Sequence, residues 1–270
     1  MKWPRLALTY VVVILSLVFF LFPVYWVLST SLKTEVQAFS MPPVWWFKPT
    51  LENYRAVVTG SYLRSFLNSL IVSAGSIAIS LLIGTPAAYA LSRFDFKRKK
   101  DLAFWILSTR MAPAVGVALP MFLFMKFFKL IDTHFSLIIL YITFNLSFVI
   151  WMMRGFFEEI PKELDESGLV DGCSPFKAFT RIVMPLAAPG LVATAIFCFI
   201  FSWNEFFFAL VMTRTATKTI PVAIAGYIGI YGIRWGEMSA AALIGALPII
   251  IFASLVQKHL VRGLTLGAVK

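Results

Sequence analysis

Two ionisable side chains stand within long apolar stretches of this sequence. Arg110 interrupts one such stretch and Glu205 interrupts another. A charge at the centre of a membrane helix costs about 2.5–3.5 kcal/mol on insertion scales, so each side chain is expected to face protein or a water-filled cavity. Trp203 and Asn204 directly precede Glu205. An aromatic face, an amide and a carboxylate could line a path for a polar solute; the alternative is that they bind neighbouring helices.

The sequence lacks the residue patterns for a disulfide framework, a metal site or ATP hydrolysis. The two cysteines, Cys173 and Cys198, cannot build a disulfide framework, and the two histidines, His134 and His259, lie far apart on unrelated segments. We therefore expect no metal site on this chain. The pattern Gly-x-x-x-x-Gly-Lys-Ser/Thr of a phosphate-binding loop is absent from the sequence. The chain is accordingly not expected to be an enzyme that binds and hydrolyses ATP by itself.

The composition indicates that lipid is the solvent of this chain. Of its 270 residues, 60% are hydrophobic and 14% are charged, whereas a soluble domain usually has about 25% charged residues. The mean hydropathy is +0.85. The net charge of +11 would suggest nucleic-acid binding in a soluble protein, but in a hydrophobic chain it mostly reflects the positive-inside rule. We expect a polytopic membrane protein that binds no nucleic acid.

Six stretches are long enough to cross a bilayer, which takes about 20 apolar residues as a helix. They are residues 6–32, 65–92, 102–128, 135–153, 185–212 and 238–257. The third contains Pro113 and Pro120 and is expected to be a broken span, because proline removes a backbone hydrogen bond. Asn68, Tyr89 and Asn145 are expected to hold neighbouring helices together by hydrogen bonds.

The distribution of basic residues predicts the orientation. Residues 93–100 include five basic side chains, whereas the next loop on the other face has Lys126 and Lys129. Basic loops remain on the cytoplasmic side, and six spans place both termini on that side. External loops are then expected at about 126–134 and 213–237. The expected parts are residues 1–32 with the cytoplasmic N-terminus and first transmembrane helix, an extracytoplasmic loop 33–62, a core 63–262 with five transmembrane helices, and a cytoplasmic tail 263–270.

The cytoplasmic loop 158–182 is expected to form a helix, a turn and a second helix. Pro161 suits the first position of a helix, and the acidic residues that follow complement the positive end of its dipole. Gly172 can adopt the left-handed conformation that ends a helix. Ser174 then caps the second helix, with Pro175 as its first residue. These residues are compatible with a docking surface and equally with a capped hairpin at the membrane interface.

Two small residues in the first of these helices suggest a close approach. Ser167 and Gly168 lack bulk where another surface could come near. A glycine in a helix interior costs about 1 kcal/mol relative to alanine, so its presence there indicates a reason in packing.

The same loop resembles the EAA loop found in the membrane permease subunits of ABC importers. That family's pattern is Glu-Ala-Ala, then a Gly, then Ile-x-Leu-Pro. The matching residues here are Glu166, Ser167, Gly168, Asp171, Gly172, Ile182, Met184 and Pro185. Ser-Gly replaces Ala-Ala, and Met replaces Leu. Further segments resemble the carbohydrate-uptake, maltose-type branch: residues 68–69, 110–113, 203–206, 257, 263–265 and 267–270.

The resemblance implies a fold and a set of partners. The fold is an all-α membrane protein with the type I permease architecture: six transmembrane helices, both termini cytoplasmic and a cytoplasmic coupling helix. The implied location of the protein is the bacterial inner membrane. The implied partners are a second related permease, two ATPase subunits that bind the ATP and Mg, an extracytoplasmic solute-binding protein, and the lipid bilayer. No cofactor is expected on this chain.

The resemblance also assigns residues to roles. The residues that it assigns to coupling with the ATPase are Glu163, Glu166, Ser167, Gly168, Asp171, Gly172 and Pro175. The residues that it assigns to the pathway of a carbohydrate or related solute are Trp203, Asn204, Glu205 and Arg110. Gly267 to Lys270 resemble a tail that in some members reaches the interface between the two ATPase subunits.

Two other classes of protein are compatible with the residues alone. A gradient-driven secondary carrier or channel would need no ATPase, although the sequence shows no internal repeat of the kind such carriers often have. A membrane scaffold without transport predicts unchanged solute uptake when Trp203 or Glu205 is replaced.

Overall fold

The computed structural model of the chain describes residues 3–230 and 232–266. It forms two compact units. One comprises Met1–Arg64 with Ala223–Leu247, and the other comprises Ser65–Val222 with Pro248–Lys270. The tail residues Gly267 and Lys270, to which an ATPase contact was assigned from sequence, lie outside the described residues.

The first unit combines one long helix with short elements. Its elements are α1 (Trp3–Ser31), α2 (Glu35–Phe39), α3 (Glu52–Thr59), the antiparallel pair β1 (Ile228–Gly229) and β2 (Gly232–Ile233), and the first part of α13 (Trp235–Leu266). The side chains of Thr34 and Gln37 form a capping box at the start of α2. The Asn53 side chain of α3 donates hydrogen bonds to the carbonyls of Ser31 and Lys33, at 2.9 and 2.8 Å. The segment expected as an extracytoplasmic loop is therefore folded against the end of α1.

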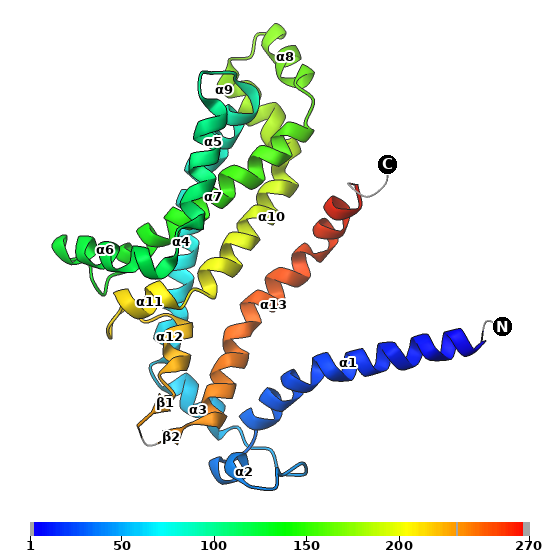
Figure 1. Ribbon diagram of the computed structural model, residues 1–270, viewed down its shortest axis with the longest axis vertical. Coiled ribbons are helices and arrows are strands. Elements are labelled where there is room, and N and C mark those ends of the chain that lie inside the picture. The colour runs from blue at the N-terminus through cyan, green and yellow to red at the C-terminus, as the bar shows by residue number, and fades with distance from the viewer. Residues whose placement is uncertain (1–2, 231, 267–270) are drawn as a thin grey trace. The chain divides into compact units, whose positions relative to one another are not determined.

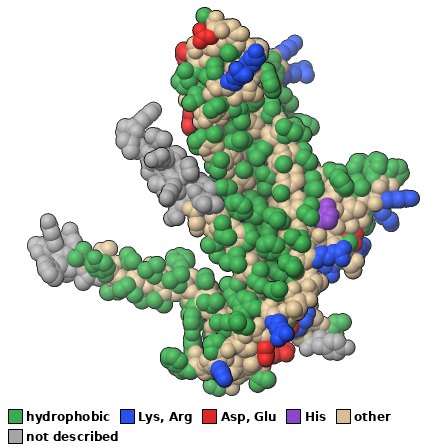
Figure 2. All heavy atoms as spheres, turned by 180° about the vertical axis from the view of Figure 1, so that it is seen from behind, with side chains coloured by type: hydrophobic (Ala, Val, Ile, Leu, Met, Phe, Trp, Pro, Cys, Tyr) green, Lys and Arg blue, Asp and Glu red, His purple; other side chains and the backbone are tan. Residues whose placement is uncertain are grey.

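The second unit is a helical bundle (Figure 1). Its elements are most of α4 (Tyr62–Arg93), α5 (Lys99–Ser108), a 3-10 turn (Thr109–Met111), α6 (Ala114–Phe127), α7 (His134–Glu159), α8 (Glu163–Val170), α9 (Pro175–Ala178), a π-helical turn (Phe179–Val183), α10 (Met184–Trp203), α11 (Phe207–Met212), the start of α12 (Ile220–Ala225) and the rest of α13. Hydrophobic side chains cover much of the visible face of the long helices (Figure 2).

Hydrogen bonds and close backbone contact hold the long helices of this unit together. The Asn145 side chain of α7 donates to the hydroxyls of Ser202 in α10 and Ser76 in α4, at 2.8 and 3.4 Å. A Cβ atom added at Gly84 of α4 would lie 2.7 Å from a methyl carbon of Val149 in α7. Small residues let helices approach closely, and polar side chains then bind across the interface, as expected within a membrane.

Five helical segments are long and apolar enough to span a membrane. They are Leu8–Ser31, Tyr62–Arg93, His134–Glu159, Pro175–Trp203 and Trp235–Ser254. The pair Lys99–Met111 and Ala114–Phe127 passes the same test together and is bent by 91°. Counted as one broken span, this pair makes six. The break predicted in the third stretch is therefore confirmed, and Pro113 stands at it as the N-cap of α6.

Two sequence-based expectations about local structure were wrong. The stretch 185–212 is not one helix, because α10 ends at Trp203 and α11 begins at Phe207. Apolar residues continue through both helices, so composition does not reveal the break. Pro161 is not the first residue of α8 either. That helix begins at Glu163, after a turn in which the Leu164 amide donates to the Pro161 carbonyl.

Candidate functional site

The loop 158–182 has the helix–turn–helix form expected from its sequence. After α8 the chain turns at Gly172, whose φ of +84° lies in the left-handed region that favours glycine. A Cβ atom at Gly172 would meet nothing within 4 Å, so the requirement for glycine is one of backbone conformation. The Ser174 hydroxyl accepts a hydrogen bond from the Lys177 amide, at 3.3 Å. Pro175 is the first residue of α9, as predicted.

Helix α8 is exposed on most of its surface. Asp165 and Gly168 are its two buried residues, and their i, i+3 spacing places them on one face. The other six residues are exposed: Glu163, Leu164, Glu166, Ser167, Leu169 and Val170. Val170 is 87% exposed. The outward surface of α8 thus combines acidic side chains with apolar ones. The helix itself lies at one end of the second unit (Figure 1).

The small residue Gly168 faces the end of a side chain from the same loop. A Cβ atom there would lie closer than 3.0 Å to the side chain of Ile182, in the π-helical turn that precedes α10. The surface that comes near Gly168 therefore belongs to the same loop. Ser167, next to it, is exposed, and its hydroxyl donates to the Leu164 carbonyl.

Asp165 was not among the predicted site residues, although it is the one buried carboxylate of α8. It forms an ion pair with Arg93 at the end of α4, with 2.8 Å between Oδ2 and Nε. It also accepts a hydrogen bond from the hydroxyl of Tyr89, one turn earlier in α4. The spacing with Gly168 could have indicated an inward face, but the sequence does not reveal the partners on α4.

The proposed pathway residues lie at the C-terminal end of α10. Trp203 is 2% exposed. Its ring stacks on that of Phe199, with 5.0 Å between centroids, and meets Phe66 edge-on at 5.4 Å. Asn204 is exposed, and its amide donates to the Ile200 carbonyl at 2.8 Å. The side chain of Asn204 is therefore the accessible one of this pair.

The Glu205 carboxylate caps the next helix. It accepts hydrogen bonds from the amides of Phe208 and Ala209, in the first turn of α11, at 2.8 and 3.0 Å. It also accepts a bond from the hydroxyl of Tyr141 in α7, at 2.9 Å. The first amides of a helix lack partners within the helix, and the Glu205 carboxylate is the acceptor for two of these amides. These contacts correspond to the alternative in which the residue binds neighbouring helices.

Arg110 lies against a different face of α10. Its guanidinium carbon is 4.8 Å from the ring centroid of Phe148 in α7 and 4.7 Å from that of Phe201 in α10. Such cation–π contacts offset part of the cost of a charge among apolar residues. Phe201 and Trp203 are two residues apart and hence roughly 200° apart around the helix. Arg110 and Trp203 therefore contact different sides of α10.

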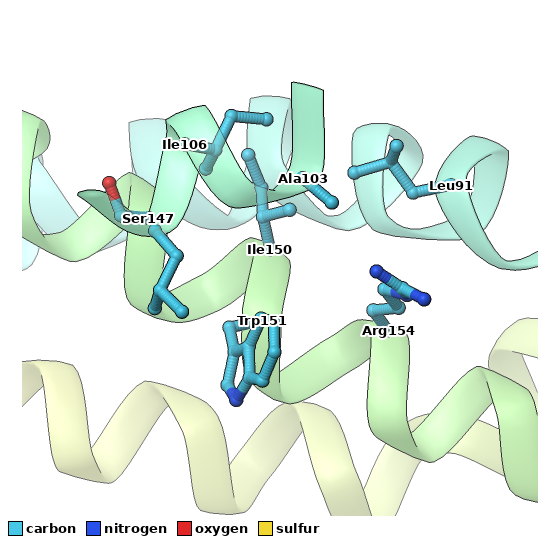
Figure 3. A pocket seen from close by; sticks show the side chains of 8 residues that line it. Leu91, Ala103, Ile106, Ser147, Ile150, Trp151 and Arg154 are labelled. Atoms are coloured by element: carbon cyan, nitrogen blue, oxygen red, sulfur yellow. The ribbon is translucent and has the colours of Figure 1, made fainter. Parts of the chain in front are cut away.

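A small cavity lies between α4, α5 and α7. It is lined by Leu91, Ala103, Ile106, Leu107, Ser147, Ile150, Trp151 and Arg154 (Figure 3). Its volume is about 10 Å³, which is at the lower limit for one water molecule. This cavity is too small for a sugar. In the part of the chain that the structure describes, no group of three or more His, Cys, Asp or Glu residues could hold a metal ion.

Asp132, between α6 and α7, binds the loop that follows α11. Its carboxylate accepts hydrogen bonds from the backbone amides of four consecutive residues, 214–217, at 3.0–3.2 Å. It also accepts one from the Thr217 hydroxyl at 2.9 Å. The Asn68 side chain donates to the carbonyls of Ala216 and Lys218. Asp132 in the expected loop 126–134 is thus bound to the first residues of the expected loop 213–237.

We expect Asp132→Asn to loosen residues 214–217. Burial raises the pKa of Asp132, but hydrogen bonds from Arg214, Ala216 and Thr217 outweigh burial and hold the pKa well below its usual value of 3.8. A carboxylate with a lowered folded-state pKa stabilises the fold above its unfolded pKa, and this stabilisation is lost as the pH falls through the folded value. In the wild-type protein, hydrogen-exchange protection of residues 214–217, corrected for the intrinsic rate, should therefore persist at about pH 4.

The amide variant should lose this protection even at neutral pH. A hydrogen bond to a charged group contributes about 1.5–3 kcal/mol, so a loss of tenfold or more is expected. Asp95→Asn is the control, because Asp95 is exposed and pairs with Lys99 at the surface. Equal protection in Asp132→Asn and wild type would contradict the role of the carboxylate.

The fold and the helical segments define a helical membrane protein with several candidate spans. Residues 76–266 match the family described as binding-protein-dependent transport system inner membrane component, and the chain belongs to this family. The prediction of an ABC importer permease is confirmed. The chain is a membrane component of the transport system rather than its ATPase, and the gradient-driven carrier is set aside.

Curated relatives match over nearly the whole chain. The probable ABC transporter permease protein y4oR of Sinorhizobium fredii is 40% identical over 253 residues, 93% of this chain and 91% of that protein. The trehalose/maltose transport system permease protein MalG of Thermococcus litoralis is 36% identical, over 95% of this chain and 94% of that protein. The diacetylchitobiose uptake system permease protein DasC of Streptomyces coelicolor is 34% identical, over 99% and 96%.

A solved structure has the same fold. One chain of a bacterial ABC transporter involved in the import of the acidic polysaccharide alginate superposes with a TM-score of 0.79. The two sequences are 24% identical, and the match covers 96% of this chain and 98% of that chain. The helical permease fold is therefore confirmed.

Proposed function

We propose that this chain is a permease subunit of an ATP-driven importer for a carbohydrate or related solute, in the bacterial inner membrane with both termini in the cytoplasm. The names of the relatives support the class of solute, because they include permeases for trehalose, maltose and diacetylchitobiose. The five basic residues within 93–100 support the orientation.

This proposal rests on the exposed surface of α8. We assign it as a coupling helix that docks into a cytoplasmic ATPase subunit, where ATP and Mg bind. Six of its eight residues are exposed, and Leu169 and Val170 present apolar surface beside the carboxylate of Glu166. Apolar groups with a charged rim are the usual composition of a protein interface. Gly172 and Pro175 supply the turn and the start of α9 that hold α8 in place.

The remaining partners follow from this assignment. The complete transporter contains a second related permease, two ATPase subunits and an extracytoplasmic solute-binding protein. A contact of the tail residues Gly267 and Lys270 with the ATPase subunits belongs to the same proposal. In the substrate pathway, Asn204 is the first solute contact on its side of α10, because it is exposed, and Trp203 and Glu205 lie next to it in the chain. Arg110 is also exposed and is a solute contact on a different side of α10.

Glu166→Lys is expected to weaken ATPase binding by at least about tenfold. The family resemblance implies that basic groups of the ATPase lie near Glu166, and like charges placed against each other across an interface cost several kcal/mol. The permease should still insert into the membrane, since Glu166 is exposed. The measurement is the amount of ATPase that co-purifies with tagged permease from mildly solubilised membranes. Glu52→Lys makes the same charge change on α3, in the segment expected on the opposite side, and should retain the ATPase. Full retention by Glu166→Lys would overturn the docking assignment.

A further inference from the structure

One guanidinium joins three elements beneath α8. Arg93 is the last residue of α4, and its two terminal nitrogens donate to the carbonyls of Phe157 and Ile160, at 2.8 and 2.9 Å. These carbonyls lie at the C-terminal end of α7. The remaining nitrogen, Nε, forms the ion pair with Asp165 of α8. The side chains of Arg93 and Asp165 are 6% and 11% exposed, so the pair is largely shielded from water.

Tyr89 provides a second attachment of the same carboxylate to α4. Its hydroxyl donates to Oδ1 of Asp165, while Arg93 pairs with Oδ2. The Tyr89 ring packs against Phe157 of α7 at 5.6 Å and against Phe179 at 4.6 Å between centroids. Both oxygens of Asp165 are therefore bound by side chains one turn apart on α4.

We propose that Asp165 is the positioning residue through which movement of α8 is transmitted to α4 and to the end of α7. This inference rests on the proposed function of α8 as the coupling helix. Apolar contacts are non-directional and permit sliding. An ion pair with both carboxylate oxygens engaged fixes direction as well as distance. Gly168 lies close to the Ile182 side chain, which adds an apolar contact on the same face of α8, while the ion pair supplies the directional one.

The alternative is that the buried pair merely keeps the loop folded. Buried ion pairs often contribute little net stability, but removal of one partner leaves an uncompensated charge. The two accounts differ in one observable. A folding role predicts that ATPase docking is lost when Asp165 is altered, whereas a transmission role predicts that docking persists while the membrane helices cease to respond.

The test uses the complete transporter with its ATPase subunits. A fluorescent maleimide is attached at Leu82→Cys, because Leu82 of α4 is 76% exposed. Cys173 is replaced by serine to prevent its labelling, and the buried Cys198 is retained. ATP and vanadate are added to the labelled transporter, and the resulting change in fluorescence is called the α4 response. Co-purification of the ATPase is measured on the same preparations.

We expect Asp165→Asn to retain the ATPase within about twofold and to reduce the α4 response about tenfold, the equivalent of one hydrogen bond to a charged group. Asp101→Asn is the matched control, because Asp101 is an exposed residue in the first turn of α5. It should leave both measurements unchanged. An undiminished response in Asp165→Asn would overturn the proposal, and so would loss of the ATPase from Asp165→Asn that is folded and inserted in the membrane.

Tyr89→Phe keeps the test decisive if Asp165→Asn fails to fold. This variant removes one hydroxyl and leaves the ring packing and the ion pair in place. It should reduce the α4 response about threefold or more, since a typical hydrogen bond contributes about 1 kcal/mol. An unchanged response would count against transmission through Asp165. Failure of the coupling-helix assignment itself is recognised separately, because Glu166→Lys would then retain the ATPase.

Discussion

Replacement of Gly190 by alanine is expected to destabilise the protein by about 1–3 kcal/mol, the usual cost of overpacking a close contact. A Cβ atom at Gly190 would lie less than 3.0 Å from three ring carbons of Phe156. Gly190 belongs to α10 and Phe156 to α7, two helices that pack along each other. Carbons at the base of a ring cannot move aside as the end of a flexible chain can, so the two helices must separate. The thermal unfolding midpoint of the detergent-solubilised protein measures this change.

Gly155 offers a matched control one residue before Phe156. A Cβ atom at Gly155 would meet nothing within 4 Å. Alanine is favoured over glycine in a helix interior by about 0.5–1 kcal/mol, so Gly155→Ala should leave the midpoint unchanged or raise it. The two substitutions are chemically identical and are expected to differ in sign. Phe156→Ala should recover part of the loss in the double variant. Equal decreases from both glycine substitutions would contradict this account of the helix contact.

Features of the chain that depend on local chemistry could be predicted from sequence. The stretch 65–92 was expected as a span, and the helix runs from Tyr62 to Arg93. Apolar length decides this because the bilayer thickness is fixed. The left-handed turn at Gly172 and the cap at Ser174 are set by single residues and their immediate neighbours. The hydrogen bonds between helices expected of Asn145 and Asn68 are also present, to Ser202 of α10 and to His134 of α7, although these partners were not predicted.

Features that depend on contacts between distant segments could not be predicted. Tyr89 and Asp165 are 76 positions apart, and neither one's residue type indicates the other. Arg93 was counted among the basic residues that orient the chain, but its side chain is buried in an ion pair. Composition also concealed the break after Trp203, because α11 is apolar like the helix before it. The only polar signals at that break are Asn204 and Glu205, and they were interpreted first as solute contacts.

The structural and pathway interpretations of Glu205 predict different results for its variants. Glu205→Leu removes the acceptor for three donors: the amides of Phe208 and Ala209 and the hydroxyl of Tyr141. Each buried donor left unpaired costs about 1–3 kcal/mol, so a total loss of about 3 kcal/mol or more is expected. Glu205→Gln retains one acceptor oxygen and should cost less. The unfolding midpoint should therefore fall in the order wild type, Gln, Leu.

A mutant cycle with Tyr141 isolates the capping contribution. Tyr141→Phe removes one donor and should cost about 1–2 kcal/mol in the wild-type background. In the Glu205→Leu background it should cost almost nothing, because its partner is already absent. Uptake is measured alongside with labelled trehalose, maltose or diacetylchitobiose, whichever the wild-type transporter imports. If Glu205→Gln abolishes uptake while its midpoint equals that of wild type, the carboxylate acts on the solute. If uptake and stability fall together along the series, Glu205 serves the pathway by holding the start of α11 against α7.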